Sequence, residues 1–433
     1  MQILLTGAHG FVGRNLRTAL RHAGHRVICV GHRGSSGGRA GDEADFATDE
    51  VDDWLPRLAG IDVVINAVGI FRERGAQSFE AIHVRGPAML FEACRRAGIP
   101  RVIQLSALGA DDEAFSAYHL SKHRADQQLL ALGLPSVAIV QPSLLYGRGG
   151  ASARLFTALA SLPFILLPGD GRQRIQPLHI DDAVHGILAL LPAQGAQGVI
   201  AFVGPRPITL REFLLTLRDA LRLPRSFVLP VPISLVRVIA SLLASRPGSL
   251  LSPAGLLSPD SLQMLERGNT GDPAALTRLI GTAPRPPACF IDEDERPAQR
   301  AAALLCWWRP LLRGVVALVW IVTGWVSLTV YPVADSLALL QRSGVPAAWT
   351  MPALVGAALL DIALGLAALL PGRRWPWAAQ MLLTLFYTVI ISLRLPEYWA
   401  HPYGPLLKNL PLLMATWLLW QTETPRPPAR RRP

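Results

Sequence analysis

Lysine is almost absent from this chain of 433 residues, although 42 of its residues are lysine or arginine. The two lysines are Lys122 and Lys408, so arginine carries nearly all of the positive charge. The formal net charge of +11 does not indicate nucleic-acid binding, because the arginines are scattered and gather only at residues 430–432. This composition is typical of a protein that works close to a membrane, and we expect no nucleic-acid partner.

Cysteine is also scarce, and its spacing excludes two kinds of site. Cys29, Cys94, Cys289 and Cys306 do not have the spacing of a metal or redox motif, so we predict neither a metal site nor a disulfide framework. The large N-terminal region is therefore expected in a reducing compartment. The sequence MQILLTG predicts a strand directly at the start, so we expect no cleavable signal peptide.

Tryptophan is distributed unevenly and divides the chain into two regions. Ten of the 11 tryptophans follow residue 306, among long apolar runs. Before residue 290, short apolar runs alternate with helix-length segments, which predicts an α/β Rossmann-type fold with a doubly wound parallel sheet. We predict an N-terminal domain at 1–290, a linker at 291–308, a membrane domain at 309–423 and a basic tail at 424–433.

A glycine-rich loop follows the first expected strand. The segment TGAHGFVG places Gly7, Gly10 and Gly13 between that strand and the expected helix RNLRTALRHAG, and Phe11 and Val12 are assigned to the cofactor site with them. Glycine is needed where the backbone turns tightly and approaches a pyrophosphate, and the helix N-terminus adds N–H groups and a positive dipole end. The loop therefore predicts a dinucleotide site; the alternative is a glycine-rich turn without a ligand.

The end of the second strand predicts which cofactor is bound. An acidic residue there would bind the ribose 2′-hydroxyl and disfavour a 2′-phosphate. The sequence has His32 and Arg33 and no carboxylate before Asp42, so NADP(H) is favoured over NAD(H); alternatively, Arg33 is a solvated surface residue. Asp45 is assigned to the adenine. The small residues after the next strand, in the NAVG segment, are expected to lie against the cofactor: Ala67, Val68 and Gly69.

One of the two lysines shares a helix face with a tyrosine. Tyr118 and Lys122 are spaced i and i+4, so both side chains lie on the same face. A tyrosine hydroxyl, with a pKa of about 10, is a poor acid–base catalyst at neutral pH unless a cation stabilises its anion. Ser106, at the end of the preceding strand, would hold the substrate oxygen at the sheet edge where ligands bind. The alternative is an ordinary surface pair.

Together these segments resemble the short-chain dehydrogenase/reductase superfamily. The similarity covers about residues 1–290 and is carried by TGAHGFVG, NAVG, LSALGAD, YHLSK, PSLLYG and QPLHIDDA. It is strongest to the atypical, extended branch similar to the NADPH-binding accessory subunit of mitochondrial complex I. The resemblance implies a substrate lobe at about residues 145–290 and a catalytic set of Ser106, Tyr118 and Lys122. It also implies that Pro142 lies in the wall beside the nicotinamide.

Two departures from the family pattern bear on the substrate. Gln141 stands where an arginine is commoner before the proline. The interval from Ser106 to Tyr118 is short compared with that of sugar-nucleotide epimerases. The second departure argues against a sugar-nucleotide substrate.

Four apolar runs follow the linker, at about residues 311–332, 351–371, 375–395 and 404–420. Each is close to the roughly 20 residues that cross a bilayer core, and Trp and Tyr flank their ends. The segments LLDIALG and HPYGPLLKNLPLL resemble the DoxX-like family, so we expect a four-helix transmembrane bundle. A carboxylate at mid-membrane is unfavourable, so Asp361 should face the bundle interior. Lys408 either pairs with Asp361 there or extends its side chain to the membrane–water interface.

The sequence therefore predicts a membrane-anchored, NAD(P)H-dependent oxidoreductase acting on a carbonyl or alcohol group of a small apolar or lipid-like substrate. The alternative is a non-catalytic NADPH-binding module that senses redox state or supports an assembly. Arginines flank the spans mainly on one side. The positive-inside rule therefore places the N-terminal domain and the C-terminus in the cytoplasm, on a bacterial-type inner membrane.

Overall fold

The computed structural model describes residues 1–32, 43–73, 75, 77–244 and 259–424. The chain forms two compact units, Met1–Leu304 and Leu305–Pro433. We describe each unit by itself.

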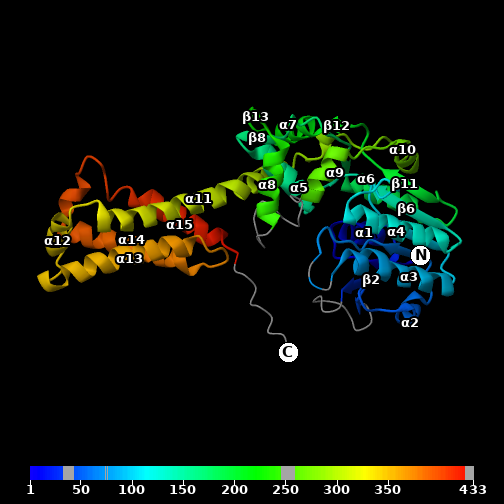
Figure 1. Cartoon of the computed structure of the whole chain (residues 1–433), viewed down its shortest axis with the longest axis horizontal. Helices are drawn as coiled ribbons and strands as arrows, with labels where there is room; N and C mark the ends of the chain where they lie inside the picture. The colour runs from blue at the N-terminus through cyan, green and yellow to red at the C-terminus, as the bar shows by residue number, and fades with distance from the viewer. Residues whose placement is uncertain (33–42, 74, 76, 245–258, 425–433) are drawn as a thin grey trace. The chain divides into compact units, whose positions relative to one another are not determined.

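The first unit is built on a parallel sheet of seven strands in the order β11-β6-β5-β4-β1-β2-β3 (Figure 1). The order steps outward from β1 in both directions, as in a doubly wound sheet, which confirms the predicted fold class. The strands are β1 (Gln2–Thr6), β2 (Arg26–His32), β3 (Glu43–Ala44), β4 (Val63–Asn66), β5 (Arg101–Leu105), β6 (Val137–Pro142) and β11 (Gly198–Phe202).

Helices cover both faces of this sheet. Successive strand residues point to opposite faces, so Ile3 and Leu5 pack with the helices on one side while Leu4 packs with those on the other. The first group comprises α1 (Phe11–His22), α6 (Ile180–Ala189) and α10 (Ala274–Ile280). The second comprises α2 (Val51–Trp54), α3 (Gly86–Arg96) and α4 (Ala117–Ala131), with a π-helical turn, η2 (Glu80–Arg85), directly before α3.

The part of this unit that is predicted to bind the substrate, which we call the substrate lobe, has a separate apolar core. Its helices are α5 (Ala151–Ser161), α7 (Leu210–Ala220), α8 (Ile233–Ala244) and α9 (Pro259–Arg267). Its short strands form three pairs: β7 (Leu145–Tyr146) with β10 (Leu178–His179), β9 (Arg174–Ile175) with β12 (Ile208–Thr209), and β8 (Phe164–Pro168) with β13 (Phe227–Val231). Ile291 and Ala303, from the segment predicted to be a linker, are buried in this core.

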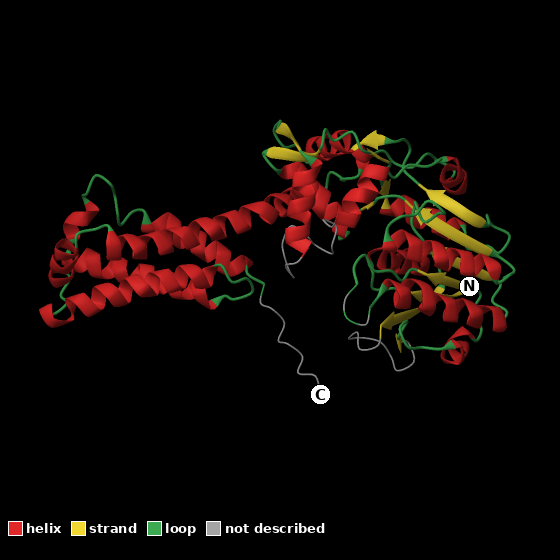
Figure 2. Ribbon diagram, viewed as in Figure 1, coloured by secondary structure: helices red, strands yellow, loops and turns green. Residues whose placement is uncertain are grey.

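The second unit consists of helices and loops (Figure 2). The helix α11 starts at Arg296 and continues to Thr329; it is followed by α12 (Val333–Arg342), α13 (Thr350–Ala368), α14 (Trp375–Arg394) and α15 (Asn409–Thr422). Among the described residues, three helical segments are long and apolar enough to cross a membrane: Arg296–Thr329, Ala347–Ala368 and Trp375–Arg394. The run predicted as a fourth span forms α15, which has 14 residues, so the four-span arrangement stays a prediction.

Charged residues mark two places in this unit. Asp361 is buried in α13, as predicted, and its Oδ1 has no hydrogen-bond partner among the described residues. Lys408 is exposed at the start of α15, and no ion pair joins it to Asp361 in the part of the chain that the structure describes. At the other end of α15, the buried Glu423 pairs with Arg309 and Arg313.

Candidate active site

The glycine loop connects β1 to α1 and leaves no room for a Cβ at Gly7 or Gly13. Gly7 adopts a φ of +68°, and a Cβ on Gly13 would lie 2.1 Å from the carbonyl oxygen of Gly7. Gly10 precedes the first residue of α1, so the N–H groups of that helix face the loop. This cradle fits a pyrophosphate, because the backbone can approach it directly and the helix dipole favours negative charge.

Of the residues predicted to read the ribose and adenine, His32 ends β2 and Asp45 directly follows β3. His32 is the last residue of β2 and pairs with Ala44 of β3, which brings Asp45 close to it in the sheet. The Asp45 carboxylate accepts a hydrogen bond from the N–H of Ala47 at 3.0 Å. Arg33 lies outside the described residues.

Lys122 joins the ends of two central strands. Its Nζ donates hydrogen bonds to the carbonyl oxygens of Val68 (3.1 Å) and Leu105 (3.0 Å), and it lies close to Gly69, where an added Cβ would be 3.3 Å from Nζ. Burial lowers the pKa of Lys122 to about 8, against an opposing effect of Asp126. The ammonium therefore lies at the sheet edge, next to the small residues predicted to contact the cofactor.

Tyr118 lies in the first turn of α4, beside Lys122. Its ring stacks on Phe71, with 4.9 Å between centroids, and meets the His83 ring edge-on at 5.5 Å. Burial, and then the charge of Asp126, raise the pKa of Tyr118 well above the ordinary value of a tyrosine. The hydroxyl therefore keeps its proton at neutral pH, as required of a group that donates a proton to a reacting oxygen.

Ser106 makes a contact that the sequence did not predict. Its hydroxyl donates a short hydrogen bond to the carboxylate of Asp126, which is 2% exposed. Burial raises the pKa of Asp126 to about 6, although the bond from Ser106 and the charge of Lys122 act in the opposite direction. Ser106 also lines the cavity described below. A role in holding the substrate oxygen stays a prediction. Asp126 follows Lys122 by four residues, a spacing that could have indicated it.

His83, in η2, is a second buried group that sequence reasoning missed. Its Nε2 accepts a hydrogen bond from the N–H of Ile70 at 2.9 Å, so its proton lies on Nδ1, which is 2.9 Å from Ser121 Oγ. The Ser121 hydroxyl in turn donates to the carbonyl oxygen of Tyr118 at 2.7 Å. Burial and the charge of Lys122 lower the pKa of His83 to about 2. This neutral imidazole therefore fixes the first turn of α4 against the segment after β4.

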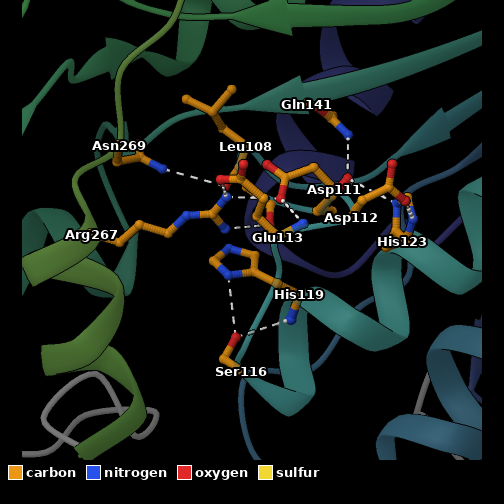
Figure 3. Close-up of polar contacts among 12 residues, drawn as sticks. Leu108, Asp111, Asp112, Glu113, Ser116, His119, His123, Gln141, Arg267 and Asn269 are labelled. Carbon is orange, nitrogen blue, oxygen red and sulfur yellow. Dashed lines mark hydrogen bonds and ion pairs between the residues drawn. The ribbon is translucent and has the colours of Figure 1, made fainter.

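The loop between β5 and α4 is held by the substrate lobe (Figure 3). Arg267, from α9, donates to the Gly109 carbonyl at 3.3 Å and to Asp111 at 2.8 Å. Burial, and then the charge of Arg267, lower the pKa of the neighbouring His119 to about 4. On the other side of the loop, the Gln141 side chain donates to the Ala110 carbonyl at 3.0 Å. The departure at Gln141 is thus part of the support for the loop that leads to Tyr118.

A cavity of about 530 Å³ connects these groups to the lobe. One end is lined by the loop and sheet-edge residues, among them Gly10, Phe11, Val12, Ala67, Val68, Gly69, Ser106, Tyr118, Lys122 and Pro142. The other end is lined mainly by leucine, valine, isoleucine, phenylalanine and methionine side chains of the lobe. Among the described residues, the cavity lining therefore includes all the predicted site residues except Gly7, Gly13, His32 and Asp45.

A glycine cradle at the first strand, a Tyr–Lys pair at the sheet edge and an adjoining lobe define a nucleotide-binding domain of the short-chain dehydrogenase/reductase type. Residues 3–204 match the NAD dependent epimerase/dehydratase family, and residues 317–417 match the DoxX-like family. The chain belongs to the NAD dependent epimerase/dehydratase family and carries a C-terminal DoxX-like domain, which confirms both predicted resemblances.

Relatives of known name include reductases and a complex I subunit. The chain is 31% identical over 191 residues to a ceramide reductase of Caulobacter vibrioides, covering 43% of this chain and 60% of the relative. It is 30% identical over 243 residues to NADH dehydrogenase (ubiquinone) 1 alpha subcomplex subunit 9 of Arabidopsis thaliana, covering 53% and 60%. It is 30% identical over 261 residues to a 2-alkyl-3-oxoalkanoate reductase of Stenotrophomonas maltophilia, covering 52% and 77%. The chain thus spans 60% of the length of the first two relatives.

Solved structures share the fold of the first unit. A nucleoside-diphosphate-sugar epimerase of Staphylococcus aureus superposes with a TM-score of 0.53 at 16% identity, covering 67% of this chain and 99% of the epimerase. At this identity the likeness shows the fold and leaves the substrate open.

Proposed function

We propose that this protein is an NADPH-dependent reductase that converts a carbonyl group of an apolar, lipid-like substrate to an alcohol at a membrane. One observation carries the proposal: the cavity joins Tyr118 and Lys122 at one end to an apolar wall at the other. Relatives named as a ceramide reductase and a 2-alkyl-3-oxoalkanoate reductase support it, because the wall fits substrates with alkyl chains.

The residues of the site divide the chemistry among them. When bound, the nicotinamide cofactor supplies the hydride for the carbonyl carbon. Tyr118 donates its hydroxyl proton to the carbonyl oxygen, and the Lys122 ammonium stabilises the phenolate left behind. Asp126 keeps Lys122 charged near neutral pH, since its carboxylate raises the Lys122 pKa against the effect of burial. Hydride and proton together convert C=O to CH–OH.

NADP(H) is preferred over NAD(H) in this proposal because His32 ends β2 and Arg33 follows it in the sequence, where an acidic residue would exclude a 2′-phosphate. Calorimetric titration of the full chain in detergent should show tighter binding of NADPH than of NADH. Arg33→Asp should reverse this order, whereas Arg21→Asp, in the last turn of α1, should leave it unchanged. Equal or tighter NADH binding by the unmodified protein would refute the preference.

The activity itself is tested by NADPH oxidation with a panel of alkyl ketones and quinones, using Tyr118→Phe as the inactive control. The second candidate, a non-catalytic NADPH-binding module, is supported by the 30% identity to a complex I subunit. Turnover that depends on Tyr118 supports the reductase. Tight NADPH binding without turnover of any compound supports the binding module.

We further propose four membrane spans with the first unit and the C-terminus in the cytoplasm of a bacterial-type inner membrane. The contacts of Glu423 support this arrangement: it pairs with Arg309 and Arg313 of α11 and accepts a hydrogen bond from the N–H of Gly372 at 2.6 Å. Three segments predicted on one side of the membrane therefore meet. Cysteines placed at Gly344 and Tyr403 should react with an impermeant reagent in intact cells, and a cysteine at Gly372 should not. The opposite pattern would refute the orientation.

A further inference from the structure

The substrate lobe carries an apolar face that the described residues leave exposed. Phe164 of β8 is 52% exposed and Phe227 of β13 is 72% exposed, and their rings stack with 6.0 Å between centroids. Leu166 of β8 and Leu229 of β13 are also exposed. In α8, the helix that follows β13 in the chain, Leu235 and Val238 are exposed as well. Figure 1 shows β8, β13 and α8 together in the lobe.

The two strands beneath this face are apolar on both sides. In β8, Ile165 and Leu167 are 1% exposed in the lobe core, while Phe164 and Leu166 between them point outward. A strand with one face in water normally alternates apolar and polar residues. Contiguous exposed apolar side chains of this kind mark a surface that meets another apolar phase.

The same elements form part of the cavity wall. Leu166, Val231 and Val236 line the cavity whose other end holds Tyr118 and Lys122. The exposed apolar face is therefore adjacent to the wall that would hold an alkyl chain. The alkyl chain of a substrate that moves from this face into the cavity would contact apolar side chains of the lobe.

The length of the connecting chain limits how far the lobe can lie from the predicted membrane domain. Ala303 is buried in the lobe core, and its carbonyl accepts a hydrogen bond from Ser161 at 3.2 Å. Leu311, where the first predicted span starts, follows eight residues later. Even fully extended, that segment reaches no more than about 28 Å. The lobe is thus held close to the bilayer, whatever its orientation, and an exposed Arg225 beside Phe227 suits anionic headgroups.

We propose that this apolar face docks on the lipid bilayer, with Phe164 and Phe227 in the interfacial region, and that an alkyl-chain substrate moves from the bilayer into the cavity past Leu166 and Val236. The docking stands on the exposed face and the short tether. The access route rests on the proposed function, because it requires a lipid-like substrate.

Depth-dependent fluorescence quenching tests the docking. The full chain, with Cys289→Ser and Cys306→Ser, is labelled with the fluorophore NBD at Phe227→Cys and placed in phosphatidylcholine nanodiscs that contain a doxyl-labelled lipid. Val199→Cys is the matched control, because Val199 is also 52% exposed but lies on β11 of the Rossmann sheet. The protein with Cys289→Ser and Cys306→Ser but no introduced cysteine is treated with NBD in the same way, and its signal is subtracted to correct for reaction at the remaining cysteines.

Docking requires that the lipid quencher removes at least half of the emission at position 227 and less than a tenth at position 199. Aqueous iodide should quench position 199 and spare position 227. Equal lipid quenching at both positions would overturn the proposal. Protection of position 227 from both quenchers would also overturn it, because a protein surface would then cover the face.

A second experiment tests the access route. Phe164→Ser with Phe227→Ser should raise the KM for a long-chain methyl ketone in nanodiscs at least tenfold, and should change the KM for a short, water-soluble methyl ketone less than twofold. The NADPH affinity should not change, because neither residue lines the cofactor end of the cavity. Equal KM changes for both ketones would overturn the route. If neither ketone is reduced, the proposed function fails, while the quenching result still decides the docking.

Discussion

Replacement of Asp126 by asparagine should stabilise the folded protein at neutral pH, although it removes a buried polar contact. Asp126 is 2% exposed, accepts a hydrogen bond from Ser106, and has an Oδ1 without a hydrogen-bond partner among the described residues. A buried carboxylate with one unpaired oxygen is poorly solvated. For this reason its pKa rises from the ordinary value of 3.8 to about 6. Asparagine has nearly the same shape and can still accept the bond from Ser106.

The pKa gives the size and the sign of the effect. A carboxyl group whose pKa is higher in the folded state binds its proton more tightly there, so it lowers the free energy of unfolding as the pH rises from about 4 to about 6. Above pH 6 the full penalty is present, about 3 kcal/mol at about 1.4 kcal/mol per pH unit. The buried amide N–H₂ offsets about 1–2 kcal/mol of the gain. Asp126→Asn should therefore raise the free energy of unfolding by about 1–2 kcal/mol at pH 7.5.

Thermal unfolding of the full chain in detergent measures this effect at two pH values. The stability difference between variant and wild type should shrink by about 2 kcal/mol between pH 7.5 and pH 4.5, because the wild-type carboxyl is protonated at the lower pH. Ser106→Ala is the matched control: it removes the hydrogen bond, keeps the carboxylate and should destabilise at pH 7.5. A difference that is independent of pH would refute the reasoning. In Asp126→Asn, Lys122 should also lose its proton at a lower pH, because Asp126 raises the pKa of Lys122. NADPH binding that depends on the Lys122 ammonium should therefore weaken at a lower pH than in the wild type.

Three further predictions concern single residues of the site. Tyr118→Phe should lower turnover at least about 100-fold, because the proton donor is lost. Calorimetry should find the NADPH Kd of this variant within about threefold of the wild-type value. Full activity of the variant would refute the role of Tyr118. His83→Leu breaks the hydrogen bonds to Ile70 and Ser121 and should lower the free energy of unfolding by about 2–4 kcal/mol. In the wild-type protein, NMR should find the His83 imidazole neutral down to about pH 3, because its pKa is about 2. Gly13→Ala places a Cβ 2.1 Å from the Gly7 carbonyl and should weaken NADPH binding at least about tenfold; Gly356→Ala, whose Cβ meets nothing within 4 Å, is the control and should not.

Local features carried most of the prediction of the fold. The glycine loop, the strand before it and the helix after it are contiguous in sequence, so their geometry follows from neighbouring residues. The spacing of Tyr118 and Lys122 places both on one helix face wherever that helix packs. The seven-stranded parallel sheet and the match of residues 317–417 to the DoxX-like family agree with the apolar periodicity and the tryptophan-rich runs.

The direction and protonation of the buried groups depended on the tertiary structure. Ser106 was predicted to hold the substrate oxygen, and the structure adds a hydrogen bond from its hydroxyl to Asp126 of α4, which the sequence did not indicate. His83 is neutral because burial and Lys122 lower its pKa, and no short motif reports either influence. Arg267 holds the loop before Tyr118 from 156 residues away in sequence.

The sequence by itself thus determined the class of fold, the glycine loop after the first strand and the division between an α/β unit and an apolar helical unit. Those depend on periodicity and on contacts between neighbours in the chain. The tertiary structure alone decided which polar groups are buried together, the pKa values that result, and which apolar residues stay exposed on β8 and β13. Burial is a property of the whole packed chain, because it depends on elements that lie far apart in sequence.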